Sequence, residues 1–213
     1  MSVLVYFYRS QWGKGYPLTK PACKGLMNIE KLVQTVSYLL KKNNYRLNYT
    51  KLIKILYLAD KASLDRINRS MTGDTYAALH NGPILNELYC LIRGKSANRE
   101  HQCYWDGRFS TDGYDLVSLS DKIPEGKLSR FEKQVLDRLD EQFHASSYDR
   151  IIDFVHDPQN CPEWHDPGST STPISLSDIL LSLGRSKEEI EHILHEESTY
   201  AEEERVLESL AVV

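Results

Sequence analysis

The stretch from Lys51 to Ala59 constrains the fold most, because its apolar residues leave almost no polar side over two helical turns. A helix that is apolar all round is a buried helix, with other elements packed against it. Asn48 or Thr50 can cap its first free amide groups. We therefore expect a buried helix at the centre of the fold, on which the rest of the chain is organised.

After Asp60 the pattern narrows to one apolar stripe, so that Lys61 is predicted to face water together with Asp65 and Arg66. Two turn signals follow, Gly73-Asp74 and Asn81-Gly82-Pro83, with a short extended run over 75–79 between them. Pro83 suits the first turn of a helix, which would carry Ile84, Leu85, Leu88 and Tyr89 inward.

This segment combines a helix that ends in Leu-Tyr-Leu-Ala-Asp, a Thr-Gly-Asp-x-Tyr motif, and Gly-Pro with a tyrosine six residues after the proline. The combination resembles the SocA-like antitoxin family, whose members carry the Panacea domain and occur in bacterial and phage toxin–antitoxin modules. The spacing spans several elements, which makes the signal fairly specific over about 27–120 and weaker to about 185. The matching positions are Leu56, Tyr57, Leu58, Ala59, Asp60, Thr72, Gly73, Asp74, Tyr76, Ala78, Gly82, Pro83 and Tyr89, with Trp164 in a later Pro-x-Trp.

Apolar stripes of helical period predict further helices over 29–42, 128–143, 148–155, 175–183 and 186–210. Ser129 with Glu132, and Ser186 with Glu189, have the spacing of capping boxes. Between 96 and 123, two aromatic or β-branched runs separated by Ser-Thr-Asp-Gly predict a β-hairpin. The expected fold is mainly α with a small β-hairpin or sheet, a compact helical α+β domain of the Panacea type.

A chain of 213 residues is long enough for one domain with a sizeable core. We expect that domain over 27–185. Residues 1–26, with four basic side chains and no acid, are expected to form an N-terminal arm or to be upstream sequence included through a misassigned start codon. Residues 186–213, with nine glutamates against Lys187 and Arg205, are expected to form an acidic C-terminal helix.

The overall composition argues for a cytoplasmic protein. Its four cysteines are widely scattered without a Cys-x-x-Cys pair, which favours a reducing cytosol over a disulfide framework. No run approaches the ~18 apolar residues of a membrane span. The net charge of −4 gives no general argument for nucleic-acid binding.

Three groups of side chains raise the question of chemistry. Asp60 and Asp74 could form a carboxylate pair, but the favoured interpretation is that Asp60 ties a helix to a neighbouring backbone and Asp74 shapes a turn. His156, Cys161 and His165 are weak metal candidates, because their spacing matches no strong motif. His192, His195 and Glu196 share a helix face and are interpreted as solvated. We expect no cofactor.

The resemblance implies an antitoxin that is not an enzyme and that binds a cognate toxin protein by direct contact. It also implies that the motif residues are structural and that variable surface recognises the partner. The toxin-binding candidates are Tyr104, Trp105 and Phe109 in or beside the hairpin and the acidic run Glu202, Glu203 and Glu204. Three alternatives stay open: a proteolytic adaptor that delivers a toxin to a protease or unfoldase, a metal-dependent hydrolase, and a DNA-binding autoregulator.

Overall fold

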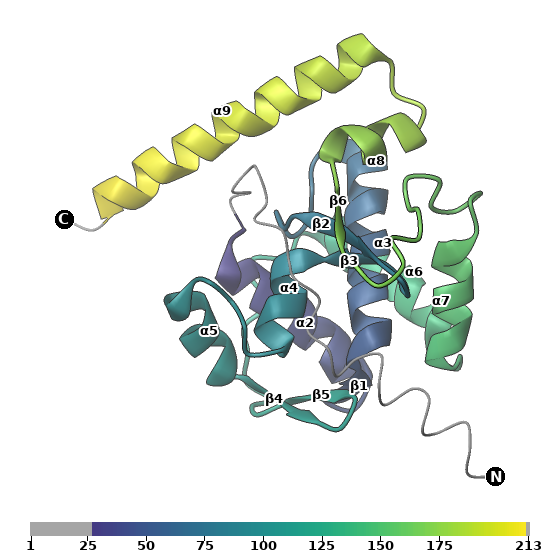
Figure 1. The fold of residues 1–213 in the computed structure, drawn as a ribbon. Coiled ribbons are helices and arrows are strands. Elements are labelled where there is room, and N and C mark those ends of the chain that lie inside the picture. Colours follow the sequence, from purple (N-terminus) through teal and green to yellow (C-terminus); the bar gives the residue numbers. More distant parts are fainter. Residues whose placement is uncertain (1–26, 212–213) are drawn as a thin grey trace.

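The computed structural model describes residues 27–211, which form eight helices and six short strands (Figure 1). The expected arm over 1–26 lies outside the described residues. In chain order the elements are α2 Ile29–Lys42, β1 Arg46–Asn48, α3 Tyr49–Ile67, β2 Tyr76–Leu79, β3 Gly82–Leu85, α4 Asn86–Ile92, α5 Arg99–Asp106, β4 Phe109–Asp112, β5 Asp115–Ser118, α6 Arg130–Phe143, α7 Tyr148–His156, β6 Thr172–Ile174, α8 Leu176–Ser182 and α9 Lys187–Ala211. The prediction of a mainly helical α+β fold is confirmed.

Helix α3 is the central element, as its all-round apolar pattern predicts. The side chain of Asn48 accepts the backbone N–H of Lys51 at 3.2 Å and caps the helix. The first twelve residues of α3 are all buried, including the side chains of Lys54 and Asp60. Helices α4, α6, α7 and α8 and strands β1 and β3 contact α3, which runs through the middle of the molecule (Figure 1).

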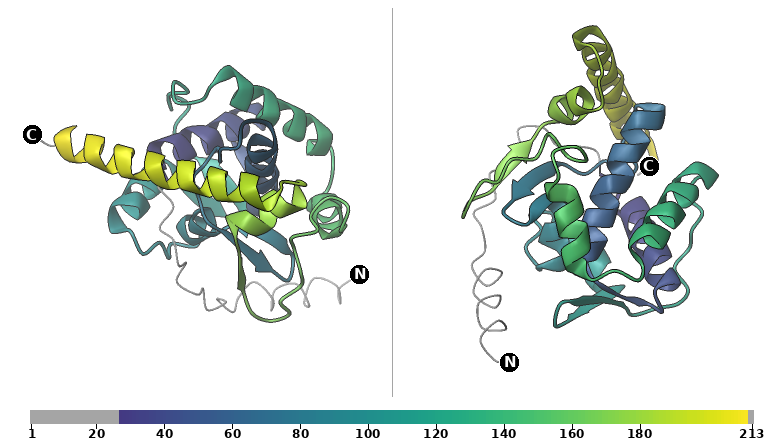
Figure 2. Two further views of the ribbon diagram at one scale, coloured as in Figure 1. Left: turned by 90° about the horizontal axis from the view of Figure 1, so that it is seen from above. Right: turned by 90° about the vertical axis from the view of Figure 1, so that its right-hand side faces the viewer.

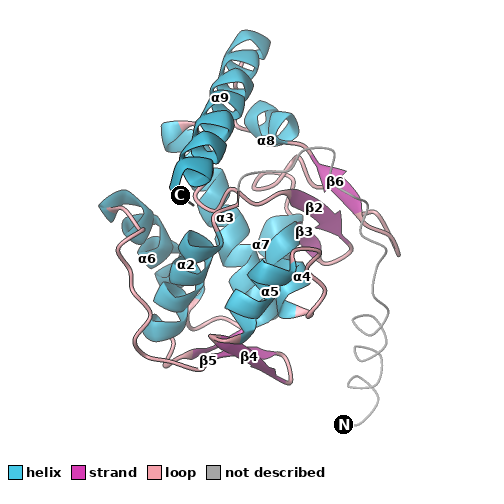
Figure 3. Cartoon of the chain, turned by 90° about the vertical axis from the view of Figure 1, so that its left-hand side faces the viewer, coloured by secondary structure: helices cyan, strands magenta, loops and turns pink. Residues whose placement is uncertain are grey.

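The strands form two antiparallel sheets of three strands each, in the orders β1-β5-β4 and β3-β2-β6. The hairpin predicted between 96 and 123 is present as β4 and β5, and the extended run over 75–79 is β2. The pairing partners β1 and β6 are three-residue strands, too short for a sequence pattern of their own. Figure 3 shows the two sheets at separate places on the helical body.

Two local predictions are wrong. The run that contains Tyr104 and Trp105 is helix α5, because Asn98 caps it by accepting the backbone N–H groups of Glu100 and His101. Pro83 lies in strand β3 rather than in the first turn of a helix, since β3 pairs with β2 through the whole length of both strands. Helix α4 begins only at Asn86.

Helix α9 lies across one end of the body and extends beyond it (Figures 1 and 2). Its first turns pack on α8 through the buried side chains of Ile190 and Ile193. The capping box of Ser186 and Glu189 is present at its start, as predicted. Among the helices of residues 27–211, none combines the length and the apolar composition that crossing a bilayer requires.

Candidate functional site

The motif residue Asp60 joins α3 to the loop that follows it. Its Oδ1 accepts the backbone N–H groups of Met71 and Thr72 at 3.0 and 2.9 Å. Its Oδ2 accepts the hydroxyl groups of Thr72, Ser70 and Tyr76 at 2.6, 2.9 and 3.1 Å. Burial raises the pKa of Asp60, and the hydrogen bonds from Thr72 and Ser70 act in the opposite direction. Every contact of this carboxylate is therefore internal to the fold.

Asp74 caps helix α4, although it precedes the helix by twelve residues in the sequence. Its two oxygens accept the backbone N–H groups of Glu87 and Leu88, each at 2.9 Å, and Oδ1 also accepts that of Thr75 at 2.6 Å. Burial raises the pKa of Asp74 to about 7 despite these hydrogen bonds. Asp74 thus supplies the N-terminal cap that Leu85 cannot provide, which explains why α4 starts after Pro83 and not at it.

A buried lysine that the sequence analysis did not single out lies between α3 and β3. Lys54 is 1% exposed, and its Nζ donates to the carbonyl oxygen of Pro83 at 2.7 Å. Burial lowers the pKa of Lys54 to about 7. The lack of a side chain at Gly82 lets Lys54 lie this close to β3, because a Cβ atom at Gly82 would lie 3.2 Å from Lys54 Nζ and 2.7 Å from Val155 Cγ2. The glycine of the Gly-Pro motif is thus required by packing as well as by its φ of +101°.

A second lysine holds the loop after α7 against α3. Lys61 Nζ lies 2.7 Å from Glu163 Oε2, and Glu163 Oε1 accepts the hydroxyl of Tyr57 at 2.5 Å. The side chain of Glu163 is fully buried and that of Lys61 is 11% exposed. The prediction that Lys61 faces water is wrong, because a carboxylate 102 residues away in the sequence pairs with it.

Trp164 fixes the same loop to the sheet. Its Nε1 donates to the carbonyl oxygen of Leu79 at 3.0 Å, and its ring stacks on that of His156 with centroids 4.2 Å apart. Burial and the nearby Lys54 lower the pKa of His156. The loop between α7 and β6 is therefore held by an ion pair, a hydrogen bond and a stacked ring pair.

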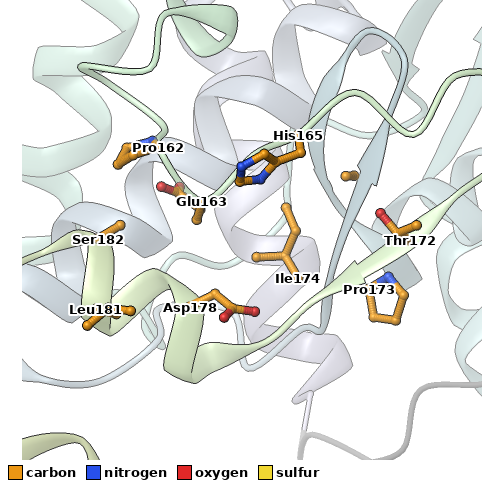
Figure 4. A pocket seen from close by; sticks show the side chains of 10 residues that line it. Pro162, Glu163, His165, Thr172, Pro173, Ile174, Asp178, Leu181 and Ser182 are labelled. Carbon is orange, nitrogen blue, oxygen red and sulfur yellow. The ribbon is translucent and has the colours of Figure 1, made fainter. Parts of the chain in front are cut away.

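This loop forms one wall of a pocket of about 450 Å³ (Figure 4). The other walls come from β2, β6 and α8. Residues of mixed character line it, namely Ala78, Pro162, Glu163, His165, Thr172, Pro173, Ile174, Asp178, Leu181 and Ser182. Neither Asp60 nor Asp74 is among them, so the suggested carboxylate pair does not face this pocket.

The weak metal candidates do not assemble into a ligand set. His156 stacks on Trp164, Cys161 is buried, and His165 is exposed at the pocket. Burial raises the pKa of the Cys161 thiol to about 12, which disfavours the thiolate that binds metals. Within the part of the chain that the structure describes, no three His, Cys, Asp or Glu side chains are grouped to hold a metal ion.

The aromatic candidates for partner contact differ in exposure. Trp105 and Phe109 are 2% and 3% exposed and pack on each other with ring centroids 4.5 Å apart. The expectation that they lie at the surface is therefore wrong, because α5 and β4 turn both rings into the core. Tyr104 is partly exposed, and the guanidinium group of Arg108 lies over its ring. A role for Tyr104 in toxin binding stays a prediction.

The acidic candidates lie on the distal half of α9. Glu202 and Glu203 are exposed, and the side chain of Glu204 lies outside the described part. Tyr200, one turn earlier, is 44% exposed and carries the guanidinium group of Arg69 over its ring. The segment that extends beyond the body is thus both acidic and accessible, and its role in binding stays a prediction.

Comparison with protein families matches residues 52–165 to the family described as antitoxin SocA-like, Panacea domain. Neither the curated proteins nor the solved structures contain a match to this chain. The matched residues include α3 from Leu52 onward, both aspartates with their hydrogen-bond networks, the Gly-Pro turn and the part of the loop that carries Trp164. This match covers more than half of the 213 residues and includes the motif residues found in the sequence. The chain therefore belongs to the SocA-like antitoxin family that carries the Panacea domain.

Proposed function

We propose that this protein is the antitoxin of a toxin–antitoxin module and that it neutralises a cognate toxin protein by direct contact. The observation that carries the proposal is the family match over residues 52–165. The contacts of the motif residues support a structural role for them, since the carboxylates of Asp60 and Asp74 accept hydrogen bonds from other groups of the same chain. An enzymatic role has no comparable support.

The surface that recognises the toxin is proposed to lie mainly after the matched residues. The domain over 27–185 would supply the scaffold, and the C-terminal helix over 186–213 would supply contact with the toxin. Nine glutamates against two basic residues give this helix a strong negative charge, and its distal half extends beyond the body (Figure 2). Such a charge favours a toxin with a basic surface and accelerates the encounter with it.

The experiment is co-purification of the tagged chain with the product of the adjacent gene, followed by measurement of the dissociation constant at several salt concentrations. We expect a stable complex whose affinity falls as salt rises, because salt screens exposed charges. Reversing Glu202 and Glu203 to lysine should weaken the complex, whereas reversing Asp121 and Glu141, exposed carboxylates outside α9, should not. Absence of a complex with the wild-type chain would overturn the proposal.

The adaptor alternative predicts the same complex, but it predicts a different fate for the bound toxin. An adaptor would hand the bound toxin to a protease, so toxin turnover would slow when the protease gene is deleted. A blocking antitoxin would leave turnover unchanged in that strain. Measuring toxin half-life in the two strains, with the chain present in both, therefore separates the two mechanisms.

A further inference from the structure

The pocket of Figure 4 lies where the family-matched part of the chain meets the part that follows it. Glu163 and His165 belong to the matched residues 52–165, whereas β6 and α8 come after them. Its volume of about 450 Å³ suits a small molecule or one large side chain of a partner.

Contacts within the chain hold the walls of the pocket in place. Hydrogen bonds from Lys61 and Tyr57 fix Glu163 at the base of the loop wall. Strand β6 pairs with β2, and a capping box of Ser175 and Asp178 starts α8. A site whose walls are already ordered loses little conformational entropy when it binds a partner.

The charged groups of the pocket favour a cation. Two carboxylates and one imidazole line it, and none of the lining residues is lysine or arginine. The buried Glu163 is already paired with Lys61. Asp178 is exposed, and its Oδ2 accepts the hydrogen bonds from the backbone N–H and the hydroxyl of Ser175, while Oδ1 accepts no hydrogen bond from the described residues.

Apolar surface lies beside this free carboxylate oxygen. Ile174 lies between His165 and Asp178 in Figure 4, and it is a buried apolar residue of the lining. Leu181 on α8 also lines the pocket and is 62% exposed. An occupant with an apolar stem and a cationic end would match both features.

We propose that this pocket receives an arginine side chain of the toxin, with the guanidinium group at Asp178 and the aliphatic stem against Ile174 and Leu181. The inference rests on the proposed function, because it names how the toxin is held. Arginine suits the site better than lysine, since its planar guanidinium group is always charged, carries five N–H donors and is more weakly hydrated than an ammonium group. Arginine is also enriched among the residues that dominate binding energy at protein interfaces.

The first test uses a small probe and needs no toxin. N-acetyl-arginine-methylamide is titrated into the ¹⁵N-labelled chain, and the neutral citrulline counterpart serves as the control. We expect saturable NMR shifts at Ile174, Asp178 and Leu181 with the arginine probe alone. Asp178→Asn should weaken binding by about tenfold or more while α8 stays folded, because the amide oxygen can still accept from Ser175. Equal shifts with citrulline, or undiminished binding by Asp178→Asn, would overturn the proposal.

The second test uses the complex with the toxin. Leu181→Lys places a cation at the pocket and should weaken toxin binding by about tenfold or more. Leu119→Lys is the matched control, because Leu119 is 56% exposed and follows β5 in the other sheet. If both variants bind the toxin as well as the wild type does, the pocket proposal fails and the antitoxin function stands.

Two further outcomes of the second test are informative. If the wild-type chain itself fails to bind the toxin, the proposed function fails and the inference falls with it. If light scattering shows that the chain self-associates and that Leu181→Lys alone abolishes this, the occupant is a second copy of the chain and the toxin assignment is wrong. Loss of toxin binding in Leu181→Lys alone, with a monomeric wild type, supports the proposal.

Discussion

Lys61 and Glu163 form a largely buried ion pair, with Nζ and Oε2 2.7 Å apart, that joins the second half of α3 to the loop between α7 and β6. Because Glu163 also accepts the hydroxyl of Tyr57, its carboxylate is held from two positions on α3. This relationship connects the buried family motif to a wall of the pocket.

Lys61→Met should destabilise the protein by about 3 kcal/mol or more, because it leaves the buried charge of Glu163 without its ionic partner. The double variant Lys61→Met/Glu163→Gln should recover part of that loss, since no uncompensated charge remains. Urea unfolding of both variants measures the free energies. If the loss of stability in the double variant equalled the sum of the losses in the two single variants, Lys61→Met and Glu163→Gln, the account would be contradicted.

Gly82→Ala should cost more stability than Gly94→Ala. Both glycines have positive φ, +101° and +66°, so alanine is strained at each. At Gly82 the new Cβ would also lie 2.7 Å from Val155 Cγ2, whereas at Gly94 it would meet nothing within 4 Å. We expect about 1 kcal/mol of loss at Gly94 and about 1–3 kcal/mol more at Gly82. Equal melting temperatures for the two variants would refute the packing role of Gly82.

Leu56→Asp should leave the chain unfolded. Leu56 is 0% exposed on the central helix, and an unpaired charge at such a position costs several kcal/mol, comparable to the whole stability of a domain. Leu181→Asp, the same change at an exposed position on α8, should leave circular dichroism and melting nearly unchanged. Native-like melting of Leu56→Asp would show that the assignment of the central helix is wrong.

Lys54 should make stability depend on pH between about pH 7 and 8.5. Its pKa is about 7 in the fold, against the ordinary value of 10.5, so the unfolded chain binds the extra proton over this window. Stability contributed by this group therefore rises as pH rises, with a slope of at most about 1.4 kcal/mol per pH unit. Lys54→Met should lose this slope whatever its absolute stability. A difference between wild type and Lys54→Met that is constant over the window would contradict the buried, neutral lysine.

The window is limited at its upper end by other groups. Burial raises the pKa of the Cys161 thiol to about 12 and that of the Tyr57 hydroxyl well above its ordinary value. Stability from both groups is lost as pH rises above their unfolded pKa values, which opposes the contribution of Lys54. Asp74, whose pKa is about 7 in the fold, opposes Lys54 in the same way at the lower end of the window. The contribution of the lysine is therefore taken from the difference between wild type and Lys54→Met below pH 8.5.

The parts of the fold that local sequence specifies are those that could be predicted. Helix α2 has the predicted bounds, because one amphipathic stripe and the two asparagines after it define the helix within its own residues. The central helix, the capping boxes and strand β2 could be predicted for the same reason, because the signal for each lies within its own residues.

The features that were missed depend on residues distant in the sequence. Helix α4 starts at Asn86 because of Asp74, and Lys61 is buried because of Glu163. Strand β6 has three residues and forms only by pairing with β2, so the pocket beside it could not be predicted. The paired lysine and glutamate leave no periodic signal, since each looks like an ordinary solvated residue in its own segment.

The central claim is tested most directly by the growth of cells that express the product of the adjacent gene with and without this chain. The account predicts that the neighbour arrests growth alone, that the wild-type chain restores growth, and that the unfolded Leu56→Asp chain does not. Restoration of growth by Leu56→Asp as well as by the wild type, or failure of the folded wild-type chain to protect against a toxic neighbour, would contradict it.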